Sequence, residues 1–215
     1  MRLIRFGATN QFFGLRGHAL VGIVGPILFW SAATVLGQTQ FAYNGLRSDI
    51  SLLALGPYGW VQTVNFSAFG VLVVVFQAGV QRALAPGRVW GAINVLAMAS
   101  GLGLVLIAVF PTDRVGVWTI HGAIHLGVAG ALAVLLPLSC LATGAQMRRD
   151  HAWRGYALFS VFIGSVTSAL TLILLLVWSG LWPASHPWLG LYERITFALP
   201  CVWMETVAIR LLRLS

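Results

Sequence analysis

Two histidines, His121 and His125, are the residues of this chain whose spacing most readily supports chemistry. Their four-residue interval places both imidazoles on one face of a helix. Such a pair can bind a divalent metal such as zinc when carboxylates complete the coordination shell. It could instead ligate a tetrapyrrole such as haem, relay protons, or form hydrogen bonds to neighbouring helices. The pair lacks the glutamate of an HExxH motif, so its spacing alone does not choose among these roles.

Further polar residues recur in three connections between apolar segments, where each connection carries one arginine with an acid close by. One interpretation is a single polar site assembled from the three connections. A simpler interpretation is that each acid neutralises its neighbouring arginine at the membrane interface. An asparagine five residues inside the second apolar segment belongs at a similar depth. The candidate ligand-binding residues are Arg47, Asp49, Asn65, Asp113, Glu193 and Arg194.

The elements that must position these residues follow from the composition. Of the 215 residues, 59% are hydrophobic and 8% are charged, whereas a soluble domain has roughly 25% charged residues. With about 20 apolar residues needed per span, this composition allows about six transmembrane helices. It excludes a disordered chain, a disulfide-stapled secreted domain and a separate soluble catalytic domain of normal size.

Six apolar segments are each long enough to cross about 30 Å of hydrocarbon. We therefore expect an all-α polytopic membrane protein, with residues 1–215 forming a single domain built as a compact bundle of six transmembrane helices. Residues 1–17 are expected to be a cytoplasmic or interfacial segment, either a short helix or a tail. The expected spans are residues 19–37, 61–80, 90–110, 118–141, 153–181 and 191–212.

The arginines predict the orientation of this bundle. All 13 basic residues are arginine, and ten of them lie in the N-terminal segment, the second and fourth connections and the C-terminal segment. The positive-inside rule then places both termini in the cytoplasm and the other three connections outside the inner (plasma) membrane. No basic patch with interleaved aromatic residues is present, so membrane lipids and not nucleic acids are the expected partners.

Three groups of residues in the chain resemble the motifs of a known family. They are Arg47–Ser51 with Gly56–Trp60 and Asn65, Phe110–Asp113 with His121–His125, and Gly190–Arg194 with Trp203 downstream. In this order they resemble the domain-of-unknown-function 998 family of six-helix prokaryotic membrane proteins, over nearly all of the chain after residue 18. The resemblance implies an architecture but no activity. Leu52–Leu55 and Leu126 stand in regions where relatives often carry polar residues.

Three functions are open at this level. The first is an outward-facing polar site that binds a small amphipathic molecule or a lipid, with metal-dependent hydrolysis as its catalytic form. The second is a non-enzymatic accessory subunit of a larger membrane complex, which could hold a pigment or haem through a histidine. The third is a small transporter, although no inverted repeat of three plus three helices is visible.

Overall fold

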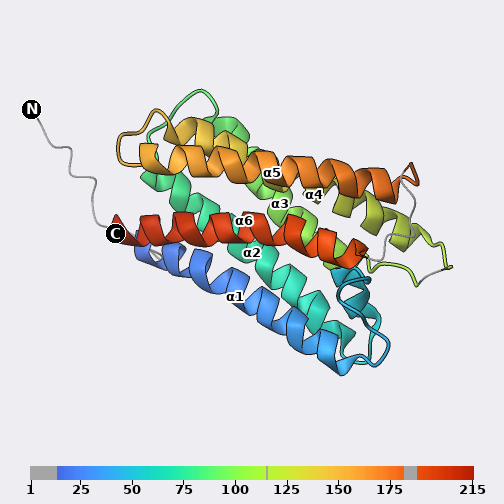
Figure 1. Cartoon of the computed structure of the whole chain (residues 1–215). Helices are drawn as coiled ribbons and strands as arrows, with labels where there is room; N and C mark the ends of the chain where they lie inside the picture. Colours follow the sequence, from blue (N-terminus) through green and yellow to red (C-terminus); the bar gives the residue numbers. More distant parts are fainter. Residues whose placement is uncertain (1–13, 115, 182–187) are drawn as a thin grey trace, which may run out of the picture.

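The computed structural model describes residues 14–114, 116–181 and 188–215 and is a bundle of helices (Figure 1). In this part of the chain there are six α-helices, one short 3-10 helix and no strand, which confirms the all-α prediction. The elements are α1 (Leu15–Thr39), η1 (Ile50–Leu55), α2 (Gly59–Ala83), α3 (Trp90–Val109), α4 (Ile120–Met147), α5 (Arg154–Trp178) and α6 (Leu189–Arg213).

Each of the six α-helices is long and apolar enough to cross a membrane. Their number agrees with the six expected spans, and the fifth span was expected to reach about residue 181. Helix α5 ends at Trp178, because Gly180 adopts a left-handed conformation with φ of 74° that terminates the helix. The expected N-terminal segment also ends earlier, since α1 begins at Leu15, and residues 1–13 lie outside the described part of the chain.

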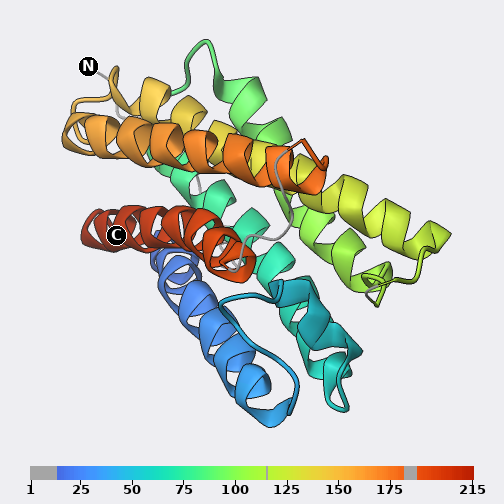
Figure 2. The same ribbon diagram turned by 45° about the vertical axis from the view of Figure 1, so that its right-hand side comes forward.

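The helices run up and down and close into a ring. Each helix packs against the next along the chain, and α6 packs against α1, α2, α4 and α5 (Figures 1 and 2). We call the end where α1, α3 and α5 terminate and α2, α4 and α6 begin the Arg-poor end, because the described part of the chain places three arginines there: Arg47 and Arg114 in connections and Arg194 in the first turns of α6. η1 lies at this end and contacts α1, α2 and α6.

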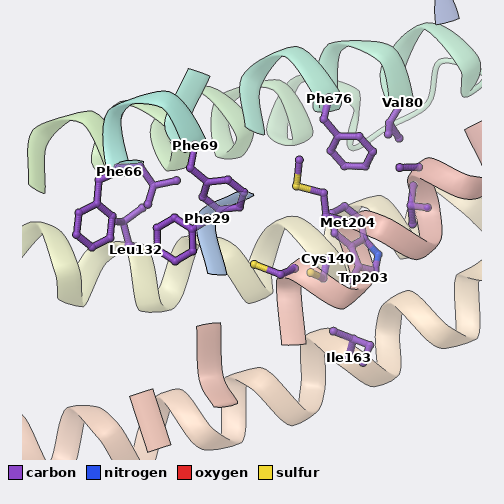
Figure 3. Packing of buried hydrophobic residues seen from close by; sticks show 14 of the residues in the cluster. Phe29, Phe66, Phe69, Phe76, Val80, Leu132, Cys140, Ile163, Trp203 and Met204 are labelled. Atoms are coloured by element: carbon purple, nitrogen blue, oxygen red, sulfur yellow. The ribbon is translucent and has the colours of Figure 1, made fainter. Parts of the chain in front are cut away.

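The interior is filled with aromatic side chains. The Phe29 ring lies 5.0 Å from that of Phe69 and 5.1 Å from that of Phe197, measured between centroids. Nearer the opposite end, the rings of Phe76 and Trp203 meet edge to face at 6.1 Å. Figure 3 shows both groups, with labelled Phe29, Phe66 and Phe69 gathered apart from Phe76 and Trp203. Such edge-on and tilted pairs add to the burial of the rings.

A proline in α4 creates a polar link between two helices. Pro137 has no N–H, so the carbonyl of Ala133 one turn earlier loses its helical hydrogen bond. The hydroxyl of Thr171 on α5 donates to that carbonyl at 2.8 Å. The hydrogen bond lost within α4 is therefore replaced by one to α5, as buried backbone in a membrane requires.

Helices α2 and α3 approach so closely that two glycines touch across the interface. A Cβ at Gly70 would lie 2.6 Å from the carbonyl oxygen of Gly101, and a Cβ at Gly101 would lie 2.7 Å from that of Gly70. Small residues at helix crossings permit this kind of backbone contact in membranes. No side chain can be added at either position unless the two helices separate.

Gly70→Ala is expected to lower the free energy of unfolding by about 1–3 kcal/mol, because the added methyl group overpacks the crossing. The matched control is Gly127→Ala on α4, where an added Cβ meets nothing within 4 Å and helix propensity favours alanine. Thermal unfolding of both variants in detergent micelles measures the difference. Equal melting temperatures for the two variants would contradict the close approach of α2 and α3.

Candidate functional site

At the Arg-poor end, Arg194 on the first turns of α6 holds the connection that follows α1. Its Nη1 donates to the carbonyl oxygens of Ser48 at 2.8 Å and Gly190 at 2.9 Å, and its Nη2 donates to the hydroxyl of Tyr43. Gly190 packs against the same backbone, since a Cβ there would collide with the Ser48 carbonyl oxygen. The hydrogen bonds of Arg194 thus hold the connection against the start of α6.

The neighbouring residue, Glu193, supports the start of η1. One of its carboxylate oxygens accepts the backbone N–H of Ile50 at 2.7 Å. Asp49, which precedes Ile50, has a buried carboxylate oxygen, Oδ1, with no hydrogen-bond partner. Burial raises the pKa of Asp49, although the charge of Arg194 opposes this shift. Two acids and one arginine therefore meet where η1 touches α6.

Asp113 has a different role, at the beginning of α4. Its carboxylate accepts the backbone N–H and the hydroxyl of Thr119, both at 2.7 Å. The Thr119 hydroxyl oxygen in turn accepts the N–H of Gly122 at 3.1 Å and caps the helix. The hydrogen bonds from Thr119, its hydroxyl first and then its backbone, lower the pKa of Asp113. Asp113 organises the N-terminus of α4, where a negative charge is also favoured by the helix dipole.

The two histidines differ in burial although they lie one turn apart on α4. His125 is buried, and its Nδ1 donates to the carbonyl oxygen of Phe110 at 2.8 Å. Because Nδ1 carries the proton, Nε2 is the acceptor of the neutral ring. His121 is exposed, and its ring meets Phe110 edge to face at 5.6 Å between centroids.

Within residues 14–114, 116–181 and 188–215, no group of three or more His, Cys, Asp and Glu side chains is arranged to hold a metal ion. A zinc ion at His121 and His125 would therefore lack a third ligand from this part of the protein. Haem ligation by either histidine stays a prediction.

A cavity of about 70 Å³ lies directly below η1, between α2, α3, α4, α5 and α6. Its polar groups gather toward the Arg-poor end, where Ser51, His125 and Glu193 line it. Deeper in the bundle the walls are apolar, except for Thr196 and for Thr167 on α5. Thr167 is 1% exposed, and its hydroxyl has no hydrogen-bond partner. The cavity thus combines apolar walls with convergent polar groups, as small-molecule sites do.

The structure brings only part of the predicted set of site residues to this cavity. His125 and Glu193 line it, and Asp49 lies beside it at the start of η1. Arg47 is exposed, and the Asn65 side-chain amide donates to the Phe29 carbonyl oxygen at 3.1 Å.

Sequence reasoning missed Tyr43, Ser51, Thr167 and Thr196. Ser51 belongs to the first of the three family motifs, and the signal of the other three was a polar residue type within or next to an apolar segment.

Six helices long and apolar enough to cross a membrane define the class: this is a multi-pass membrane protein. The chain belongs to the family described as protein of unknown function (DUF998), whose model matches residues 23–210. That match confirms the resemblance inferred from the three motifs. Neither a curated protein nor a solved structure matches the chain.

Arg194→Lys is expected to lower the free energy of unfolding by about 1–3 kcal/mol, because a single ammonium cannot serve both carbonyls and the Tyr43 hydroxyl at once. Arg47→Lys is the matched control, since the Arg47 side chain is exposed in the same connection. Thermal unfolding in detergent micelles reports both variants. A loss of stability in the control as large as that in Arg194→Lys would contradict the assignment.

Asp113→Asn is expected to destabilise the protein at neutral pH and to lose this effect in acid. The pKa of Asp113 is lowered by folding, so its stabilisation is complete above the unfolded value of about 3.9 and is lost as pH falls through the folded value. The melting temperature of wild type and variant should therefore differ at pH 7 and converge below about pH 4. A difference that persists in acid would contradict the role of the Asp113 carboxylate in holding Thr119.

Proposed function

We propose that the protein binds a small amphipathic molecule or a lipid in the cavity below η1, on the outer side of the membrane. The polar head of the ligand lies near Glu193 and His125, and its apolar part lies among the side chains deeper in the bundle. The observation that carries the proposal is the polar end of an otherwise apolar cavity. The outer placement rests on the sequence, in which ten of the 13 arginines lie in the N-terminal segment, the second and fourth connections and the C-terminal segment.

The unpartnered hydroxyl of Thr167 supports a ligand in this cavity. A buried hydroxyl without a hydrogen bond destabilises the folded state by about 1–3 kcal/mol. A ligand or water held in the cavity would supply the missing partner. The cavity of about 70 Å³ exceeds the roughly 10–15 Å³ that one water needs.

Binding, and not hydrolysis, is the function proposed. Hydrolysis by a metal-bound water needs several protein ligands on the ion, and the described residues gather no three such side chains. Glu193 and His125 can hold a polar head by accepting or donating hydrogen bonds without a metal.

The test is binding of three short-chain amphipaths, whose size is nearer that of a cavity of about 70 Å³, to the protein in lipid nanodiscs: radiolabelled butanoic acid, butylamine and butanol. Protein-free discs give the background. We expect saturable binding of at least one probe and a loss of at least tenfold in affinity, which is about 1.4 kcal/mol, in Ala129→Phe. Ala129 lines the cavity, so the larger side chain fills it.

The matched control is Ala131→Phe, two residues along α4 on an exposed position, which should bind as wild type does. The helix content and elution profile of both variants establish that they fold. The proposal fails if no probe binds saturably to wild type, or if both variants bind equally well.

A further inference from the structure

An open groove of about 290 Å³ lies on the outside of the bundle, between α1 and α6. These two helices are neighbours, α1 in blue and α6 in red (Figures 1 and 2). The cavity below η1 is lined by a different face of α6, with Glu193, Thr196 and Phe197. Ile195 and Val202, which line the groove, are exposed. The outer face of α6 is therefore a second surface, separate from the proposed ligand site.

The groove follows α6 for three turns with the spacing of a helix-packing surface. Its residues on α6 are Arg194, Ile195, Ala198, Cys201, Val202 and Glu205. Intervals of three, four and seven residues along such a stripe are the periodicity with which a second helix packs. From residue 194 to residue 205 the stripe is about 16 Å long. The small side chains of Ala198 and Cys201 allow a helix to approach α6 closely.

Glu205 places a carboxylate in this groove at a depth where hydrocarbon surrounds the bundle. Helix α6 has 25 residues and ends at Arg213, eight residues after Glu205. At helical rise the whole helix is about 37 Å long, so it exceeds about 30 Å of hydrocarbon by only a few ångströms at each end. Glu205, about 12 Å from the end of the helix, thus lies roughly 8 Å inside the hydrocarbon.

The Glu205 carboxylate has no partner within the described part of the chain. No hydrogen bond or ion pair joins it to another described residue. The other charged residue of the groove, Arg194, is already engaged with the connection that follows α1. An ionisable side chain inside a span usually pairs with another group or faces the bundle interior, because an unpaired charge in hydrocarbon is costly. Glu205 therefore calls for a partner from outside the chain.

Trp30 of α1 forms the opposite wall of the groove and favours a cation there. Its indole N–H donates to the sulfur of Cys201, which lies one turn before Glu205. Its ring also packs against that of Phe197, at 5.9 Å between centroids. These contacts fix the indole beside the groove. Because an aromatic ring attracts an ammonium or guanidinium group within about 6 Å, the ring and the carboxylate both favour a positive charge.

We propose that the groove between α1 and α6 binds a transmembrane helix of a partner protein that carries a lysine or arginine near the middle of its span. The partner helix packs along the stripe of α6, and its cation pairs with the Glu205 carboxylate beside Trp30. A second copy of this chain fits less well, because a two-fold axis along the stripe would bring two Glu205 carboxylates together. A lipid acyl chain offers no group to pair with the carboxylate.

The test uses synthetic transmembrane peptides of leucine and alanine with one lysine at the centre, and the fluorescently labelled protein in lipid vesicles. Glu205 lies four residues from the middle of α6, about 6 Å, so a central lysine reaches it in either orientation of the peptide. The matched peptide has leucine at the centre. Energy transfer should show that the lysine peptide binds wild type more tightly by about tenfold or more. Glu205→Gln, which removes the charge and keeps the shape, should lose this preference.

Two further variants test the charge and the shape of the groove separately. Glu205→Lys should reverse the preference, so that a peptide with a central glutamate binds and the lysine peptide does not. Ala198→Phe fills the groove and should weaken binding of the lysine peptide by about tenfold. Its control, Ala131→Phe on an exposed position of α4, should bind as wild type does. Helix content and elution profile establish which variants fold.

Equal affinity of wild type for the lysine and leucine peptides, or a lysine preference that persists in Glu205→Gln, would overturn the partner helix. Energy transfer between copies of the labelled protein that is lost in Glu205→Gln would overturn it as well, because the groove would then hold a second copy. Binding of amphipaths to the cavity below η1 is measured in a separate assay. Failure of that function and failure of this interaction surface are therefore distinguishable.

Discussion

The architecture of the Arg-poor end depends on hydrogen bonds between adjacent residues of α6 and the backbone of a connection about 145 positions earlier in the chain. Glu193 accepts the N–H of Ile50, and Arg194 donates to the carbonyl of Ser48. Irregular backbone at the edge of a bilayer is tolerated only when protein or water satisfies it. These hydrogen bonds give the backbone groups of Ile50 and Ser48 the partners that they need. They also join the start of α6 to the segment that follows α1 and hold η1 over the cavity.

The same requirement explains where polar groups remain available for a ligand. Most buried polar side chains are committed to the fold: Gln77 donates to the Thr143 hydroxyl, and Trp203 donates to the Ser160 hydroxyl. The hydroxyls of Thr167 and Ser100 have no hydrogen-bond partner, and each of these residues lines one of two cavities in the bundle. In a medium without competing water, such groups determine what a cavity accepts more sharply than its apolar walls do.

The sequence was sufficient to predict six membrane-spanning helices, because an apolar helix satisfies the hydrogen bonds of its own backbone wherever it lies in the bilayer. It was less informative about individual polar residues, whose partners depend on the fold. Asp113 and Arg114 are adjacent, yet the hydrogen bonds of Asp113 go to Thr119. His121 and His125 share the periodicity of one helix face, yet one is exposed and the other is buried. The cavity itself could not be foreseen, because side chains from five helices and η1 enclose it.

The hydrogen bond from Thr171 to the Ala133 carbonyl bears on how the protein enters the membrane. Pro137 leaves that carbonyl without a partner in an isolated α4, and Thr171 would bring a hydroxyl into the hydrocarbon with α5 alone. Both polar groups are satisfied once the two helices lie together. Pairing of α4 with α5 during insertion therefore avoids leaving either group unsatisfied in the hydrocarbon.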